Sequence, residues 1–182
     1  LEAALRAHGY TLGHFPQSFE YSTLGGWIAT RSSGQQSLYY GRIEDLFAGG
    51  RMVAPAGALD MLPHAASAAG PDLRQLVLGS EGRMGFVTRA TVRVCPLPED
   101  EQFHGVFFKT WEQGVEAVRQ MVQARLPLSM LRLSNGAETE TTLALAGHEQ
   151  LVDLAHRGLG LLGFRRGEKC MLILGATGDP VT

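Results

Sequence analysis

Two segments rich in glycine and hydroxyl residues constrain the fold of this chain more than any other feature. The first is PQSFEYSTLGGWIATRSSG at residues 16–34, and the second is GSEGRMG at residues 79–85. Because glycine has no Cβ, the backbone N–H groups beside it can approach a ligand closely, and serine and threonine hydroxyls add further donors. The two segments therefore predict two main-chain cradles for an anion such as a nucleotide phosphate.

The second segment has the glycine spacing of a dinucleotide-binding fingerprint but lacks its context. A Rossmann fingerprint follows a strand and begins a helix, whereas residues 86–94 alternate like a half-buried strand. We therefore expect no Rossmann site. A tight turn is the plain alternative for three glycines before a strand, and the presence of the first segment favours a ligand site.

Composition excludes several classes of function. The formal net charge of −2 and the absence of a Lys/Arg run predict no nucleic-acid partner. Cys95 and Cys170 are the only cysteines, which fits a reducing, cytoplasmic compartment, and the six histidines lack metal-ligand spacing, so we expect no metal. Every apolar run is shorter than the roughly 20 residues that cross a bilayer.

Short elements are expected around the two glycine segments. Proline at a helix start and alternation within strands are the signals that place them. The expected elements are a helix over residues 1–7, strand pieces at 43–48 and 51–54, a helix over 71–78 and a strand over 86–94.

Residues 96–101 indicate a domain boundary, because they combine two prolines with three acids. The expected domains are residues 1–97 and 98–182. Beyond the boundary, Thr110 and Gln113 have the spacing of a capping box before a helix with Trp111, Val115, Val118 and Val122 on one face. Strands at 105–108, 129–133 and 169–174 and a helix over 148–162 complete a β-α-β-α-β order.

This order predicts an α+β fold in which helices cover one side of a sheet. Both ends of the chain are read as cuts through a longer protein, because residue 1 is not Met and residue 182 closely follows a strand-like run.

Several single residues have both a functional and a plain interpretation. Arg31 could pair with a phosphate or lie in a polar surface turn, and Glu20 and Glu81 could accept hydrogen bonds from a ribose or be solvated loop carboxylates. Trp27 is expected in the core, and His14 and Tyr21 could position a ring or pack in ordinary loops. Arg132 lies within an apolar strand; it faces water, or it faces inward and meets an anion.

The chain resembles a known family at these residues. Residues 16–34 are similar to P-D-S-x-E-x-S-T-x-G-G-W-x-x-T-R-x-S-G, with Gln17 in place of Asp. Residues 80–91 match S-E-G-x-x-G-x-x-T-x-A-T, and residues 40–45 resemble Y-G-x-I-E-D. These motifs are typical of flavoproteins of the vanillyl-alcohol-oxidase type, and most closely of the alkyldihydroxyacetonephosphate synthases of ether-lipid synthesis.

The resemblance implies the second half of a PCMH-type FAD-binding domain, followed by the start of an α/β cap domain with an antiparallel sheet. Arg132 would be the catalytic arginine near the flavin and the substrate phosphate. The upstream P-T-G-G-G-T-S loop and the downstream tyrosine and histidine cluster of the family are not in the chain. The implied FAD-binding residues are Gln17, Ser18, Phe19, Glu20, Tyr21, Ser22, Thr23, Gly25, Gly26, Thr30, Arg31, Ser32, Ser33, Glu81, Gly82, Arg83, Met84, Gly85, Phe86 and Val87.

The implied activity exchanges the acyl group of acyl-dihydroxyacetone phosphate for a long-chain alcohol, with FAD as cofactor and no net redox change. Lipid substrates, a peripheral membrane contact and a homodimer of the full-length protein are the implied partners, and the segment alone is expected to be inactive. Two alternatives stay open, namely an FAD-dependent 2-hydroxy-acid dehydrogenase of the lactate or glycolate class and a non-catalytic flavin-binding module.

Overall fold

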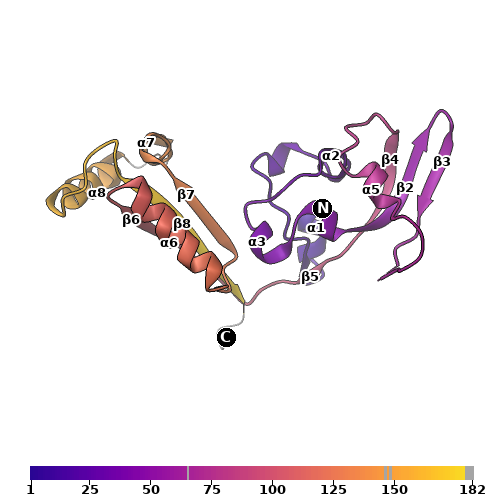
Figure 1. Ribbon diagram of the computed structural model, residues 1–182, viewed down its shortest axis with the longest axis horizontal. Helices are drawn as coiled ribbons and strands as arrows, with labels where there is room; N and C mark the ends of the chain where they lie inside the picture. Colours follow the sequence, from indigo (N-terminus) through magenta and orange to yellow (C-terminus); the bar gives the residue numbers. More distant parts are fainter. Residues whose placement is uncertain (65, 146, 148, 179–182) are drawn as a thin grey trace. The chain divides into compact units, whose positions relative to one another are not determined.

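A computed structural model describes residues 1–64, 66–145, 147 and 149–178 of the chain (Figure 1). It divides into two compact units, Leu1–Pro98 and Glu99–Thr182. The division lies one residue from the boundary that the prolines and acids of residues 96–101 indicate. Each unit has its own sheet.

The first unit is built on a three-stranded antiparallel sheet in the order β3-β2-β4. Its strands are β2 (Phe47–Ala54), β3 (Gly57–Met61) and β4 (Phe86–Val92), and the short strands β1 (Tyr10–Thr11) and β5 (Cys95–Pro96) pair separately. Short helices pack against the sheet and bury a cluster around Ile28, Phe47 and Val77, each 0% exposed. The helices are α1 (Glu2–Arg6), η1 (Phe19–Tyr21), α2 (Leu24–Thr30), α3 (Ser37–Tyr40), α4 (Ile43–Leu46) and α5 (Arg74–Val77).

Two expectations for this unit are wrong in detail. Residues 43–48 do not form a strand piece: residues 43–46 are helical, and β2 begins at Phe47. The Asp45 carboxylate accepts the Arg42 N–H at 2.8 Å, which closes a helical turn. The helix expected over 71–78 begins only at Arg74, because the Asp72 carboxylate accepts the Arg74 N–H at 3.0 Å and holds the preceding residues in a turn.

β4 confirms the expected strand but not its simple alternation. The pairing of β2 with β4 shifts between Arg51 and Met52, whose partners are Arg89 and Val87, so Thr88 is the extra residue of a bulge. Val87 and Ala90 both pack against the core although they are three residues apart. Simple alternation would place Phe86 on the same face as Ala90, but the bulge places Val87 there, and Phe86 is 80% exposed.

The second unit contains an antiparallel sheet in the order β6-β8-β7, with α6 lying along it (Figure 1). The central strand β8 buries Cys170 and Leu172, which are 2% and 0% exposed. The elements are β6 (Asp100–Phe108), α6 (Trp111–Gln123), β7 (Met130–Ser134), α7 (Gly136–Leu145), α8 (Glu149–Leu161) and β8 (Cys170–Gly178).

The structure confirms the antiparallel sheet but adds one helix that the sequence did not indicate. α7 follows β7 directly, so the order is β-α-β-α-α-β. The helix expected over 148–162 begins at Glu149, and His148 lies outside the described residues. The hydroxyl of Thr110 accepts the Gln113 N–H, as half of the expected capping box.

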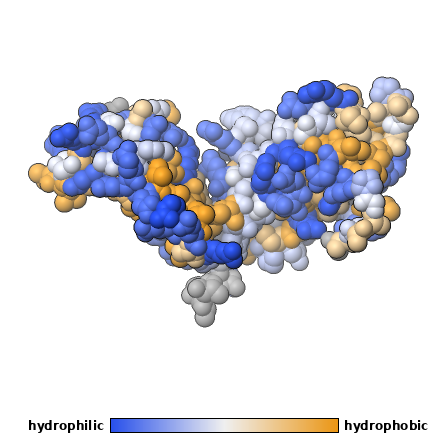
Figure 2. All heavy atoms as spheres, viewed as in Figure 1, coloured by the Kyte–Doolittle hydropathy of each residue, from blue (hydrophilic) through white to orange (hydrophobic). Residues whose placement is uncertain are grey.

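The apolar face expected for α6 is only partly packed, because Val118 on it is partly buried and its other members are exposed. Trp111, Val115 and Val122 are 44%, 43% and 53% exposed, and hydrophobic residues reach the surface of this unit in Figure 2. Gly114, on the same side of the helix as Trp111 and Val118, is the position closest to the sheet, where an added Cβ would lie 2.8 Å from Leu133 Cδ1. Close approach at a glycine, which a hydrophobicity pattern ignores, decides the orientation of the helix.

The start of α7 predicts a steric test of the second unit. Gly136→Ala places a methyl group against the carbonyl oxygen of Gly167, which is backbone and has little room to move. We expect a loss of about 1–3 kcal/mol in the free energy of unfolding, measured by urea denaturation. Gly158→Ala, within α8 and with nothing within 4 Å of the added methyl, is the control and should gain about 0.5–1 kcal/mol. Equal effects of the two changes would contradict this packing.

Candidate functional site

The first glycine segment is organised by the start of α2. Thr23 caps the helix, since its Oγ1 accepts the Gly26 N–H at 3.1 Å. Trp27, one turn later, is 5% exposed, and its indole Nε1 donates to Ser22 Oγ at 2.7 Å. Ser22 in turn donates to the carbonyl of Ser18 at 2.8 Å. The Ser22 hydroxyl therefore bonds within its own segment, and Trp27 is a core residue, as the plain interpretation predicts.

An aromatic group fixes the loop that precedes α2. The Phe19 ring stacks on Trp27 with centroids 5.9 Å apart, and the edge of His14 meets Trp27 at 5.1 Å. Phe15 packs against Phe19 at 5.3 Å. Residues 14–27 are therefore wrapped around one indole, which holds the backbone of the first segment in a defined shape.

The second glycine segment is bonded to the carboxyl end of α2. The Gly79 N–H donates to the Ile28 carbonyl at 3.1 Å, and the Glu81 N–H donates to the Ala29 carbonyl at 2.9 Å. Gly79, Glu81 and Gly82 have φ values of 75°, 53° and 80°, the left-handed region that favours glycine. The two segments, fifty residues apart in sequence, therefore lie together at one end of a single helix.

These bonds occupy several N–H groups that the sequence assigned to a ligand. The N–H groups of Gly26, Ser32, Glu81 and Arg83 all donate to oxygens of the protein itself. Gly25 and Gly82 differ, because nothing lies within 4 Å of the position where a Cβ would stand. The open backbone at these two glycines is where a ligand can come closest to the main chain.

None of the residues predicted to bind the cofactor is buried. Tyr21 and Phe86 are 92% and 80% exposed, and Met84 is 45% exposed. Large apolar side chains at the surface of a glycine-rich site offer contact area to a ring system as well as to phosphates. The segments therefore combine open backbone, hydroxyl groups and accessible aromatic surface.

Arg31 has protein partners, which supports its plain interpretation. It stands in the left-handed region with φ 51° at the end of α2. Its Nη2 donates to Gln75 Oε1 at 2.6 Å, and its Nε lies 3.4 Å from a carboxylate oxygen of Glu44. Asp45, Arg74 and Arg93 complete the lining of a polar cavity of about 340 Å³ beside these groups. Arg31 thus joins α2, α4 and α5, a connection that the sequence did not indicate.

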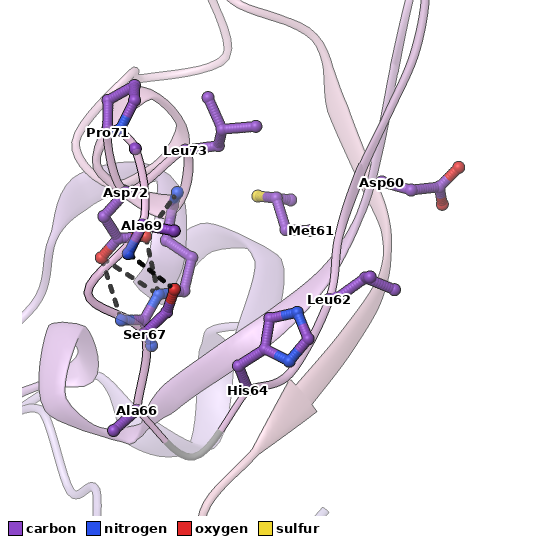
Figure 3. Close-up of a pocket in the computed structure, with 12 residues that line it drawn as sticks. Asp60, Met61, Leu62, His64, Ala66, Ser67, Ala69, Pro71, Asp72 and Leu73 are labelled. Carbon is purple, nitrogen blue, oxygen red and sulfur yellow. Dashed lines mark hydrogen bonds and ion pairs between the residues drawn. The ribbon is translucent and has the colours of Figure 1, made fainter.

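A second cavity of this unit, of about 310 Å³, lies outside the predicted site (Figure 3). It is lined by the loop between β3 and α5, and none of the predicted cofactor residues takes part. Arg74 at its edge is held by the Asp72 carboxylate at 2.9 Å and donates to the Phe47 carbonyl at 3.1 Å. The alanine-rich sequence of this loop gave no signal for a cavity.

His14 is the buried titratable group of the site. It is 0% exposed, and its Nε2 shares a hydrogen bond of 2.7 Å with Ser32 Oγ. Its Nδ1 has no hydrogen-bond partner among the described residues. Burial lowers the pKa of His14 below its ordinary value, so the imidazole is neutral. The sequence offered His14 only as a loop residue that could position a ring.

Arg132 lies in the second unit and is half-exposed. Its neighbours on the same face of β7, Met130 and Ser134, are 7% and 2% exposed, whereas the Arg132 side chain is 37% exposed. Its Nη2 donates to Glu138 Oε1 at 2.6 Å, and this bond lowers the pKa of Glu138. The anion that an inward arginine would require is therefore present as Glu138, while a catalytic role for Arg132 stays a prediction.

The sequence also missed a charged group between α7 and β8. Lys169 is 1% exposed and pairs with Glu140, which also accepts the Gly167 N–H at 3.2 Å. Burial alone would raise the pKa of Glu140, but the bonds from Lys169 and Gly167 outweigh it and the net shift is downward. A lysine immediately before an apolar strand was the available signal, and it was hidden because α7 was not expected.

In the described part of the chain, no group of three or more His, Cys, Asp or Glu side chains could hold a metal ion. Within the same residues, no helix is both long enough and apolar enough to cross a membrane.

Comparison with known proteins supplies the family. A model of the FAD binding domain matches residues 1–60, and a model of the C-terminal domain of FAD linked oxidases matches residues 97–182. The chain belongs to the FAD-linked oxidase family. Both matches fall on the units described above, the first on the glycine segment around α2 and the second on the unit that contains Arg132.

The chain is similar both to synthases and to a dehydrogenase. Alkyldihydroxyacetonephosphate synthase of Dictyostelium discoideum is 41% identical over 144 residues, which are 79% of this chain and 24% of that protein. D-lactate dehydrogenase of Archaeoglobus fulgidus is 30% identical over 136 residues, 71% of this chain and 29% of that protein. A solved alkyldihydroxyacetonephosphate synthase structure superposes with a TM-score of 0.86 at 35% identity, covering 98% of this chain and 32% of that one. The chain thus spans about a quarter to a third of its relatives' length.

The first unit fits the flavin cofactor of the family. Open backbone at Gly25 and Gly82 allows close approach of phosphate oxygens, and the exposed rings of Tyr21 and Phe86 offer apolar contact. Partly exposed Ser32 adds a hydroxyl group at the end of α2. These groups suit a nucleotide that carries both a diphosphate and a large ring.

The buried imidazole predicts a loss of stability in mild acid. Because burial lowers the pKa of His14 below 6.5, the unfolded chain binds a proton at pH values where the folded chain does not. The His14 contribution is therefore fully present above about pH 6.5 and is lost as the pH falls toward the folded-state pKa. Urea unfolding between about pH 7.5 and pH 5 measures this loss.

The variant His14→Gln should lose less stability than the wild type over this pH range, whatever its stability at neutral pH. His8→Gln, which replaces an exposed histidine of the same unit, should keep the wild-type loss. An identical pH dependence in His14→Gln and the wild type would contradict a buried neutral imidazole.

Proposed function

We propose that this chain is the part of an alkyldihydroxyacetonephosphate synthase that grips FAD and begins the substrate cap. The observation that carries the proposal is the superposition of 98% of the chain on a solved synthase with a TM-score of 0.86. The identity of 41% to a synthase, against 30% to a D-lactate dehydrogenase, supports the same choice.

The proposed reaction exchanges one oxygen substituent for another. The bond from the dihydroxyacetone-phosphate carbon to the acyl oxygen breaks, the fatty acid leaves, and a bond to the oxygen of a long-chain alcohol forms while the alcohol proton is released. FAD, when bound, would supply a ring that accepts electron density from the reacting carbon and returns it, so that no net oxidation results. The role of this chain is to hold the cofactor and the substrate phosphate in the orientation that the reaction requires.

In this proposal, some residues of the first unit contact the cofactor and others hold the two glycine segments in place. Gly25 and Gly82 present open backbone to the diphosphate, and Ser32 presents a hydroxyl at the end of α2. The bonds from Gly79 and Glu81 to α2 keep the two segments at a fixed separation. A cofactor that contacts both segments meets a site that is already arranged, so little ordering entropy is lost on binding.

Arg132 is the proposed phosphate and intermediate-stabilising group of the second unit. A guanidinium has five N–H donors, and the bond to Glu138 uses the Nη2 end. The remaining donors of a side chain that is 37% exposed can meet a substrate oxygen. Glu138 thereby orients Arg132 and leaves it a partly free cation for an anionic substrate.

An exchange assay on the full-length protein tests the proposed function. Acyl-dihydroxyacetone phosphate and a labelled long-chain alcohol should give a labelled ether and release free fatty acid, with no change in the flavin absorbance after turnover. Bleaching of the flavin by D-lactate without oxygen would instead establish a dehydrogenase. A colourless protein that refuses FAD in a titration would establish a non-catalytic module.

The open approach at Gly25 predicts a selective loss of cofactor binding. Gly25→Leu adds a side chain where nothing lies within 4 Å, so the fold is retained while the approach of a ligand is blocked. We expect the FAD dissociation constant to rise about 100-fold or more, by flavin fluorescence titration, with little change in unfolding temperature. Gly105→Leu, at an equally open glycine of β6, is the control and should bind FAD normally. Normal FAD binding by Gly25→Leu would refute this placement.

The proposed role of Arg132 predicts a loss of turnover without a loss of fold. Arg132→Met should lower kcat/KM by about 10²–10³-fold while FAD binding persists, because a charge that stabilises the transition state is removed. Arg119→Met, which removes another exposed arginine paired with a carboxylate of the same unit, should leave kcat/KM unchanged. Equal losses in the two variants would assign the effect to general electrostatics.

The remaining expectations stay predictions. They are the peripheral membrane contact, the homodimer of the full-length protein and the cytoplasmic location. The long-chain substrates make the membrane contact chemically reasonable, because both are lipids.

A further inference from the structure

The backbone that leads into His14 is anchored to the interior of the first unit. The preceding residues are anchored to α1, since the Glu2 carboxylate accepts the Thr11 hydroxyl at 2.8 Å and the Leu12 N–H at 2.9 Å. Leu12 is 1% exposed and belongs to the core. The backbone at His14 is thus part of the rigid interior and not of a loose loop.

The imidazole of His14 joins these anchored residues to the end of α2. Its edge packs against Trp27 at 5.1 Å, and its Nε2 lies 2.7 Å from Ser32 Oγ. Ser32 follows Arg31, the left-handed residue at which the helix ends, and its own N–H donates to the Trp27 carbonyl at 3.0 Å. Both the backbone and the side chain of Ser32 are therefore fixed.

The unpartnered Nδ1 of His14 decides the tautomer. A neutral imidazole has one N–H donor and one acceptor nitrogen. If Nδ1 carried the proton, a buried N–H donor would have no acceptor among the described residues, which is rarer and costlier than an unused acceptor. The proton therefore lies on Nε2, and Nε2–H donates to Ser32 Oγ.

This tautomer determines what Ser32 can do. A serine hydroxyl that accepts one bond still has its own proton to donate. Ser32 is only partly buried, so that proton can reach a bound molecule. The geometry points to His14 as a buried positioning residue that makes Ser32 a hydrogen-bond donor toward an oxygen of the flavin nucleotide.

The single hydrogen bond of the His14 ring goes to a hydroxyl that a ligand can reach. Its Nε2 is paired with Ser32 Oγ, which is only partly buried, and its Nδ1 has no partner among the described residues. The donor that results stands at the end of α2, where the second glycine segment is also bonded. The inference rests on the proposed flavin site. It adds the direction of one hydrogen bond, in which the Ser32 hydroxyl donates and an oxygen of the nucleotide accepts.

Nuclear magnetic resonance of the flavin-free, full-length protein tests the tautomer directly. The ¹⁵N shifts of the His14 ring should show a protonated Nε2 and an unprotonated Nδ1. A protonated Nδ1 would overturn the inference, because the Ser32 hydroxyl would then donate its hydrogen bond to Nε2 of His14. This measurement is independent of FAD, so it stands even where the proposed function fails.

Flavin titration of four variants tests the consequence for binding. His14→Leu and Ser32→Ala should each raise the FAD dissociation constant about tenfold, the effect of one lost hydrogen bond. The double variant should be no weaker than either single variant, because both changes remove the same donor. His14→Gln, whose amide can still donate to Ser32, should stay within about threefold of the wild type.

Three results would contradict the role of His14. They are unchanged binding by His14→Leu, additive losses in the double variant, and a loss in His14→Gln as large as in His14→Leu. His8→Leu is the matched control, because it removes an exposed histidine from the same unit. If the wild type itself binds no FAD, the flavin site is refuted, and the ring shifts still report on His14.

Discussion

The two backbone hydrogen bonds from Gly79 and Glu81 to the last carbonyls of α2 are the constraint on which the first unit depends. They add partners to carbonyls at the end of the helix, where Ile28 also accepts the Arg31 N–H at 3.2 Å, and they join segments fifty residues apart. The positive φ values of the second segment are what bring its N–H groups to those carbonyls. Without this connection, the two glycine segments would be separate turns and no common ligand surface would exist.

The same connection explains why the glycines have different roles. Some N–H groups beside them bond the protein, which builds the site, while Gly25 and Gly82 remain open for a ligand. Arg31 and Ser32 continue this division, because Arg31 joins three helices and Ser32 has a fixed hydroxyl at the surface. The motif of residues 16–34 therefore combines structural positions with positions that face a ligand. The hydrogen bonds of the folded chain distinguish the two kinds of position.

Signals that are local in sequence predicted most elements, and features that depend on packing were missed. The α+β class, the two glycine segments and the strand after Gly85 follow from glycine spacing and alternation. The bulge at Thr88, the orientation of α6 around Gly114 and the whole of α7 do not, because each is decided by contacts with distant strands. The same holds in the site, where Gln75 and Glu44 hold Arg31 from other elements.

The Lys169–Glu140 pair limits how the second unit can change in evolution. Lys169 is 1% exposed, and its partner comes from α7. Replacing Glu140 alone would leave the buried charge of Lys169 without its partner, at a cost of about 3–5 kcal/mol, whereas exchanging both for apolar residues can be close to neutral. The two positions should therefore covary among relatives, present together as a pair or absent together.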